Sequence, residues 1–226
     1  MATVQNRPRG PDIKLTVHEF VTLDGVMQGP GAPEEDTSGG FDRGGWVVPF
    51  VDEDFGRIVD GWFRSTTELL YGRTTYQLMA GYWPQVTDPD DHVAAALNTS
   101  PKHVVSTTLT DPQWSNTVGV ISEDVVAAVR ALKERPGDEL QVHGCWQLVQ
   151  TLHNAGLVDE YRLLEFPVVV GGGKRVFHDG AAASNFTVVH SETTGSGAVY
   201  RVLQPVPFQA GTVAVEDGKD VAGVHV

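Results

Sequence analysis

The sequence predicts an α/β fold in which a mixed sheet is flanked by helices. Segments typical of strands alternate along the chain with segments typical of helices, and glycines stand where several strands end. The chain has 226 residues, of which 41% are hydrophobic, so one ordinary globular domain with a packed core is expected. We assign this domain to residues 13–208, between a flexible N-terminal tail (residues 1–12) and a C-terminal extension (residues 209–226). We interpret the extension as loose, with pairing as an edge strand as the alternative.

The predicted strands begin near the N-terminus. Residues 13–21 alternate apolar and polar side chains, as a strand with two unlike faces does. Further short strands are expected at residues 68–71, 103–106, 118–121, 140–143 and 161–166. Residues 186–191 and 198–203 alternate in the same way around a glycine-containing turn, which predicts an antiparallel pair.

Apolar residues at helical spacing predict the helices between these strands. The first such run contains Phe55, Ile58 and Trp62, and a short helix is expected at residues 74–80. A third helix is expected to start at a Ser122 cap and to end before Pro136, and a fourth covers residues 146–152. The segment from residue 24 to residue 45 contains eight glycines and prolines after its Gly25, and a loop of this length is usually functional or disordered.

Composition excludes several functions. The chain carries 16 basic and 29 acidic residues, a net charge of −13, which argues against nonspecific nucleic-acid binding. No apolar run approaches the roughly 20 residues that cross a bilayer, and no signal peptide is evident, so a cytoplasmic protein without membrane attachment is expected. The single cysteine allows no disulfide within the chain, and the eight scattered histidines predict no metal site.

Four motifs put polar residues or glycine where a predicted strand ends, which is where ligands bind in open α/β sheets. Their chemically useful residues are Asp24 after the first strand, Gly72, Arg73, Thr74 and Thr75 after the second, Ser106 and Thr107 after the third, and His143, Gly144, Cys145, Trp146 and Gln147 after the fifth. A glycine before a helix start lets an anion approach free backbone N–H groups. The sequence therefore predicts an anion-binding edge.

Each motif also has a structural interpretation. Asp24 suits a turn before Gly25, and residues 72–75 suit a glycine turn with a threonine cap and a solvated arginine. Cys145 is better explained as a packing residue than as a nucleophile, because nothing identifies a base beside it. His143 is left open between a substrate contact and a strand residue that faces a neighbour.

The order of these motifs resembles a known family. The segments that carry the resemblance are residues 22–25 (TLDG), 70–76 (LYGRTTY), 102–106 (KHVVS) and the long block 144–177. Over residues 13–203 the chain resembles the dihydrofolate-reductase-like proteins, specifically the group related to the reductase domain of bacterial bifunctional riboflavin-biosynthesis deaminase-reductases.

The resemblance implies helices on both faces of the sheet, an NADPH site across its crevice and a homodimer. Residues 72–75 would hold phosphate groups, Ser106 and Thr107 would lie by the adenosine ribose and its 2′-phosphate, and residues 144–147 would cradle the pyrophosphate. Asp24 would border the nicotinamide and a small-molecule substrate, whose side would be closed by Gly171, Gly172 and Gly173.

The chain departs from the family pattern on the substrate side. Thr107 stands where related reductases often carry an arginine for the 2′-phosphate, so NADH is not excluded. His143 and Cys145 replace a glutamate and a second glycine, Val26 replaces a lysine that often follows the Asp-Gly pair, and no deaminase domain is present. The substrate therefore stays open.

The leading hypothesis is an NADPH-dependent oxidoreductase resembling 5-amino-6-(5-phosphoribosylamino)uracil reductase of riboflavin biosynthesis. It would transfer hydride to a small polar heterocyclic or carbonyl substrate, with Asp24 and then His143 as candidates for holding or protonating it. The alternative is a noncatalytic nucleotide-binding dimer that retains the fold. A true folate reductase is less favoured, because the acidic residues between 52 and 60 offer no unique match to the acid that faces the pterin in those enzymes.

Overall fold

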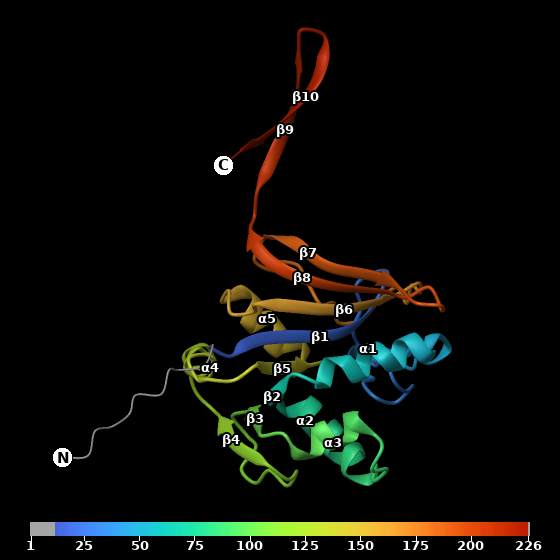
Figure 1. Cartoon of the computed structure of the whole chain (residues 1–226), viewed down its shortest axis with the longest axis vertical. Helices are drawn as coiled ribbons and strands as arrows, with labels where there is room; N and C mark the ends of the chain where they lie inside the picture. Colours follow the sequence, from blue (N-terminus) through green and yellow to red (C-terminus); the bar gives the residue numbers. More distant parts are fainter. Residues whose placement is uncertain (1–11, 226) are drawn as a thin grey trace, which may run out of the picture.

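An eight-stranded sheet in the order β4-β3-β2-β5-β1-β6-β8-β7 forms the centre of the computed structural model, which describes residues 12–225 (Figure 1). Its strands are β1 (Lys14–Thr22), β2 (Thr66–Gly72), β3 (Lys102–Val105), β4 (Thr117–Ile121), β5 (Glu139–His143), β6 (Glu160–Phe166), β7 (Ser184–Thr193) and β8 (Val199–Pro207). The α-helices are α1 (Glu53–Phe63), α2 (Arg73–Tyr82), α3 (His92–Thr99), α4 (Val125–Lys133) and α5 (Trp146–Asn154). A separate hairpin of β9 (Ala210–Glu216) and β10 (Lys219–His225) projects from the sheet (Figure 1).

The sheet is mixed, as the sequence predicts. Strands β4, β3, β2, β5, β1 and β6 are all parallel, and β8 and β7 continue the sheet in antiparallel register. Parallel strands direct their carboxyl ends to one edge of a sheet. The five strand ends that carry the predicted motifs or lead into them, those of β3, β2, β5, β1 and β6, therefore share one edge.

Alternation along β1 explains how helices cover both faces. Leu15 and Val17 point to the face where Val129 of α4 and Val149 of α5 complete the main core cluster. Phe20 points the other way, with its ring centroid 5.4 Å from that of Trp62 in α1. The prediction of helices on both faces is confirmed.

Three of the α-helices begin with a side-chain cap, and the two that begin at the site do not. Asp52, Asp91 and Asp124 cap α1, α3 and α4, each accepting a hydrogen bond from a backbone N–H in the first turn. Gly72 and Cys145 precede α2 and α5 and provide no side-chain cap. The predicted Ser122 cap is wrong, because the turn after β4 continues to Asp124 before the helix begins.

Other differences from the sequence predictions lie outside the central sheet. Helix α3 was not predicted, and the segment from residue 210 to residue 225, predicted as loose, forms the β9–β10 hairpin. The predicted N-terminal tail lies outside the described residues except for Asp12, which forms an isolated bridge with Pro136. Between residues 12 and 225, no helix combines the length and apolar character that a membrane span requires.

Candidate functional site

The sheet brings the predicted motifs together in one row. Along the order β3-β2-β5-β1, the strand ends lead into Ser106, Gly72, Gly144 and Asp24. Residues 171–173 follow β6, the next strand, and contact Asp24 directly. Segments separated by more than a hundred residues in the chain thus become neighbours along the edge where ligands bind in α/β sheets.

The starts of α2 and α5 are in direct contact. The backbone N–H of Gly72 donates to the Sγ atom of Cys145 across 3.0 Å. A Cβ atom on Gly144 would lie 3.4 Å from Cγ2 of Thr75. A side chain at position 144 would therefore occupy the space between these helix starts. The φ of 65° at Gly144 also favours glycine.

These two helix starts fit a phosphate-bearing ligand. Neither has a side-chain cap, so the N–H groups of their first turns have no side-chain acceptor. Arg73, Thr74 and Gln147 are exposed around them. Free N–H groups and the positive end of the helix dipole attract anions, and a nearby guanidinium adds to that attraction.

Ser106 and Thr107 differ in burial and in hydrogen bonding. The Oγ atom of Ser106 accepts hydrogen bonds from the backbone N–H groups of Thr108 (3.1 Å) and Leu109 (2.9 Å), so this buried hydroxyl shapes the loop after β3. Thr107 is exposed. Of the two residues, Thr107 is the one whose side chain is free to meet a ligand group.

Cys145 precedes α5 and contacts both the last residue of β5 and the residue before α2. Its thiol contacts the carbonyl oxygen of His143 at 3.5 Å and accepts from Gly72, and its φ is 71°. Burial raises the pKa of the Cys145 thiol to about 12. A buried, protonated thiol is a poor nucleophile, which agrees with a packing role.

Glu19 is a residue at this site that sequence reasoning missed. It lies on β1, is 4% exposed, and accepts a hydrogen bond from the backbone N–H of Gly144. Its Oε1 atom is buried and has no partner within the described residues. Burial raises the pKa of Glu19 well above its usual range, although the bond from Gly144 acts in the opposite direction. A buried carboxyl group thus lies beneath the start of α5. The position of Glu19 in an alternating strand was the available signal for its burial.

Asp24 ties two loops together. Its carboxylate accepts from the Thr22 hydroxyl (2.6 Å) and from the backbone N–H groups of Gly171 (2.8 Å) and Val170 (3.3 Å). Partial burial favours a higher pKa for Asp24, but these hydrogen bonds together hold its pKa below the ordinary value. Asp24 is therefore ionised at neutral pH. This geometry argues against the expectation that Asp24 protonates a substrate, and it puts Asp24 beside the turn of residues 171–173.

A cavity of about 640 Å³ opens between the long loop and the segment after β6. Gln28 builds its wall: the side-chain N–H₂ group donates to the carbonyl oxygens of Asp36 (3.0 Å) and Ser38 (2.9 Å), and the side-chain oxygen accepts from the N–H of Lys174 (3.0 Å). The Lys174 ammonium group also pairs with the Asp36 carboxylate at 2.6 Å. The long loop is thus held in place by partly buried polar contacts.

Trp146 joins this cavity to the row of strand ends. It is the first residue of α5 and lines the cavity together with Gly172, Gly173 and Arg175. Its indole N–H donates to the carbonyl oxygen of Arg175 at 3.0 Å. Three of the predicted site residues, Trp146, Gly172 and Gly173, therefore share one cavity, whereas residues 72–75, Ser106 and Thr107 do not line it.

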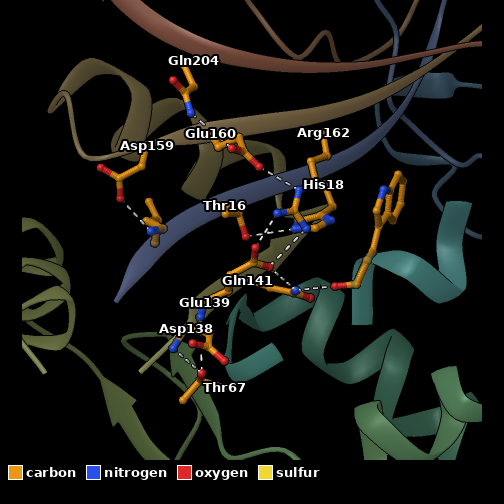
Figure 2. A network of polar contacts seen from close by, with 12 residues as sticks. Thr16, His18, Thr67, Asp138, Glu139, Gln141, Asp159, Glu160, Arg162 and Gln204 are labelled. Carbon is orange, nitrogen blue, oxygen red and sulfur yellow. Dashed lines mark hydrogen bonds and ion pairs between the residues drawn. The ribbon is translucent and has the colours of Figure 1, made fainter. Parts of the chain in front are cut away.

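His143 belongs to a buried polar network on the face covered by α1. Figure 2 shows the part of this network that joins β5, β1 and β6, where Arg162 reaches Glu139 and Gln141 contacts the same carboxylate at 2.7 Å. The Gln141 N–H₂ group donates there and to the Trp62 carbonyl oxygen (2.6 Å), so its oxygen is left to accept from Nε2 of His143 at 3.0 Å.

The surroundings of His143 keep its ring neutral. Burial, and next the positive charge of Arg162, lower the pKa of His143 to about 3. The ring stacks on Phe63 at 4.8 Å and lies 4.7 Å from the ring of His18. A neutral imidazole with this pKa has no proton to release as an acid at neutral pH, which argues against the predicted protonating role of His143.

The strand order and the helices on both faces define a dihydrofolate-reductase-like α/β protein, and comparison with known proteins narrows this class. The RibD C-terminal domain model matches residues 13–200. The chain therefore belongs to the RibD C-terminal domain family, a family of reductase type, as the sequence motifs indicate. The uncharacterized protein YyaP of Bacillus subtilis (strain 168) is 32% identical over 181 residues, which cover 79% of this chain and 88% of YyaP.

Solved structures agree on the fold. A putative riboflavin biosynthesis protein from Shewanella sp. PV-4 superposes with a TM-score of 0.61 at 20% identity, covering 86% of this chain and 99% of that protein. A dihydrofolate reductase from Enterococcus faecalis, solved in complex with NADP(H), gives a TM-score of 0.53 at 13% identity and covers 85% of this chain and 96% of that enzyme. The predicted fold class is confirmed.

Proposed function

We propose that this protein is an oxidoreductase that uses a nicotinamide dinucleotide, NADPH before NADH, to reduce a small polar heterocyclic or carbonyl compound. The observation that carries the proposal is the contact between two uncapped helix starts, joined through Gly72 and Cys145. Membership of a reductase-type family and the NADP(H) bound by the Enterococcus faecalis enzyme support the choice of cofactor.

In this proposal the chain positions the dinucleotide along the row of strand ends. The first-turn N–H groups of α2 and α5 and the Arg73 guanidinium bind its phosphates, and Thr107 meets the adenosine ribose. When bound, the nicotinamide supplies the hydride. The protein contributes binding, orientation and exclusion of water, which together account for much of catalysis in such enzymes.

We place the substrate at the same row of strand ends, beside the nicotinamide. The cavity beside Trp146 and the glycine turn that Asp24 holds lie next to the start of α5, where the reacting ring is expected. Neither Asp24 nor His143 carries a transferable proton at neutral pH, so water is the proposed proton source. The enzyme that the sequence resembles reduces 5-amino-6-(5-phosphoribosylamino)uracil. For this chain we propose only the class of substrate.

Nicotinamide fluorescence tests the cofactor proposal. NADPH added to the wild-type protein is expected to bind saturably, and Arg73→Ala is expected to weaken binding by roughly tenfold, because one charge-assisted contact to phosphate is lost. Arg64→Ala is the matched control, since Arg64 is exposed and pairs with Asp60 on α1. The proposal fails if neither NADPH nor NADH binds the wild-type protein.

A second candidate function is nucleotide binding without turnover. It is favoured by one observation: neither of the two predicted acid–base residues is suited to donate a proton to a substrate. Asp24 accepts hydrogen bonds from three donors, and His143 is buried and neutral. Steady oxidation of NADPH with any member of a pteridine, pyrimidine and carbonyl panel would exclude this candidate. Binding without oxidation across the whole panel would favour it.

A folate reductase is disfavoured by the inner face of α1. The buried residues of this helix are Ile58 and Trp62. Its acidic residues lie elsewhere: Glu53 is exposed, Asp54 accepts from the backbone N–H of Gly195, and Asp60 pairs with Arg64. No acid of α1 therefore faces the sheet in the way that the folate reductases require, and we expect dihydrofolate to be a poor substrate.

A further inference from the structure

Glu19 places a carboxyl group under the start of α5. Side chains alternate along β1, so Glu19 lies on the same face as Val17, which belongs to the core cluster that α5 completes. His18, the residue before it, points to the opposite face and into the network of Figure 2. Glu19 is 4% exposed and accepts a hydrogen bond from the backbone N–H of Gly144, two residues before α5 begins.

Glu19 differs from the other buried glutamates in its partners. Within residues 12–225, three further glutamates are 5% or 6% exposed, and each pairs with an arginine: Glu68 with Arg135, and both Glu139 and Glu160 with Arg162. Glu19 forms no such ion pair in this part of the chain, and its Oε1 atom has no hydrogen-bond partner there. The carboxyl group is therefore buried without a compensating cation.

This environment favours the neutral form of the carboxyl group. A buried carboxylate is stable only when cations or several hydrogen bonds replace its lost hydration. Glu19 has a single backbone N–H for this purpose. Burial accordingly raises the pKa of Glu19 well above its usual range, although the hydrogen bond from Gly144 acts in the opposite direction. We therefore expect Glu19 to keep its proton at neutral pH.

The titratable groups that face Glu19 do not supply a compensating charge. Negative charge on Glu19 would raise the pKa of Cys145, before α5, and of Tyr161, on β6. Burial already raises the pKa of Cys145 to about 12 and also raises that of Tyr161, so both groups are neutral at neutral pH. His153 of α5 contacts the Tyr161 hydroxyl through Nδ1 (2.9 Å) and the Ala182 carbonyl oxygen through Nε2 (2.8 Å), which a neutral imidazole satisfies.

The position of Gly144 links Glu19 to phosphate binding. Gly144 connects β5 to the start of α5. A hydrogen-bond acceptor on β1 fixes the peptide N–H of Gly144 toward the sheet, while the N–H groups in the first turn of α5 have no side-chain cap. An ionised carboxylate at the same place would repel phosphate, and the repulsion would be strong because the surroundings are apolar. A neutral acid supplies the acceptor without the repulsion.

We propose that Glu19 is a positioning residue of the cofactor site, which as a neutral acid anchors the Gly144 peptide and thereby sets the start of α5 for phosphate binding. The inference rests on the proposed binding of a dinucleotide at this helix start. Glu19 acts through Gly144 and does not itself contact the ligand. Phosphate binding and retention of the Glu19 proton favour each other, because ionisation would replace an anchor by a repelling charge.

Fluorescence titrations with NADPH near neutral pH test this inference on the full-length protein. Glu19→Met keeps an unbranched side chain but removes the acceptor oxygen, and it is expected to raise the Kd roughly tenfold. Glu19→Gln keeps a neutral acceptor and is expected to restore the wild-type Kd. Glu160→Gln is the matched control, because it neutralises a buried glutamate that lies in the network of Figure 2, on the other face of the sheet. It is expected to leave the Kd unchanged.

The glutamine variant separates a neutral Glu19 from an ionised one. If Glu19 were ionised, it would oppose phosphate binding in the wild type, and Glu19→Gln would lower the Kd by roughly tenfold or more. Such a decrease would overturn the inference. A wild-type Kd for Glu19→Met, or an equal loss of affinity in the methionine and glutamine variants, would also overturn it. Far-ultraviolet circular dichroism of each variant shows whether the fold is retained.

Carbon-13 spectra of the protein labelled at the glutamate Cδ atoms detect the proton on Glu19 without any cofactor. The Glu19 signal is the one that Glu19→Gln removes, and near neutral pH it is expected at the chemical shift of a protonated acid. The shift of an ionised carboxylate would overturn the inference. Failure of the proposed function is distinguishable, because the wild type would then bind neither NADPH nor NADH, and the inferred role of Glu19 would fall with it.

Discussion

The backbone N–H of Gly72 and the Sγ atom of Cys145 are 3.0 Å apart, although 73 positions separate the two residues in the chain. This hydrogen bond links the residue before α2 to the residue before α5. It therefore joins two helix starts that have no side-chain caps, the type of helix start that attracts anions. The proposed cofactor site depends on this arrangement.

Closing the space at Gly144 is expected to weaken cofactor binding. Alanine in the left-handed conformation costs about 1–2 kcal/mol, so Gly144→Ala should lower the free energy of unfolding by that amount. Its Cβ would also lie 3.4 Å from Thr75 and fill the junction of the helix starts. Gly156→Ala is the matched control, because Gly156 has a φ of 63° but no atom within 4 Å of the position that a Cβ would take. Both variants should lose similar stability in urea, while only Gly144→Ala should raise the Kd for NADPH.

An arginine at position 107 is expected to favour NADPH over NADH. Thr107 is exposed at the end of β3, and a guanidinium there can pair with a 2′-phosphate. A charge-assisted hydrogen bond of about 1.5–3 kcal/mol corresponds to roughly tenfold or more in the ratio of the two Kd values. Thr110→Arg adds the same charge farther along the exposed loop and should leave the ratio nearly unchanged. Equal ratios for the two variants would argue against the assigned position of the ribose.

Removing the charge of Asp24 is expected to loosen the glycine turn. Asp24→Asn loses acceptor capacity toward Gly171 and Val170, at a cost of about 1 kcal/mol. Hydrogen exchange at the amides of residues 171–173 should become faster, whereas Asp42→Asn, which alters an exposed carboxylate lining the same cavity, should not affect it. Because the folded-state pKa of Asp24 is lowered, its stabilising effect is present above the ordinary pKa and is lost as pH falls. The stability difference between wild type and Asp24→Asn should therefore shrink in acid.

The buried histidines are expected to make the protein sensitive to acid. His143 has a pKa of about 3 in the folded state, against 6.5 when unperturbed. Between these values the unfolded chain binds a proton that the folded chain does not, so stability falls by about 1.4 kcal/mol per pH unit as pH decreases. Burial also lowers the pKa of His18, which adds a second contribution of the same sign. His143→Phe keeps an aromatic ring against Phe63 and should give a shallower acid limb in urea unfolding measured from about pH 7 to about pH 4. An unchanged slope would contradict this account, because it would mean that His143 has the same pKa in the folded and unfolded states.

Local patterns were sufficient to predict most of the central sheet. The alternation in β1 and the glycines after β2 and β5 are properties of neighbouring residues, and each element lies within a few residues of its predicted bounds. Helix α3 was missed although its signals are local: Asp91 caps it, and Ala94 and Leu97 form its buried side. The fold class depends on such repeated local patterns, which explains why it could be predicted.

The contacts of the candidate site could not be predicted from the sequence, because they join segments that are far apart in the chain. The sequence near Glu19 gives no sign that Gly144 donates to its carboxyl group, because that contact needs β1 and β5 to be aligned. Gln28 organises the long loop through Lys174, 146 positions away. The sequence left two interpretations open for both Asp24 and His143 for the same reason, since their partners come from other elements or from the surrounding network.

The most direct measurement is a titration of the amide-labelled protein with NADPH, followed by ¹H–¹⁵N correlation spectra. The proposed site predicts that the amide signals of residues 73–75 and of residues 144–147 shift together, at the same ligand concentrations, because one dinucleotide contacts both helix starts. Saturable shifts at only one of these helix starts, or shifts confined to another surface, would contradict the shared cofactor site.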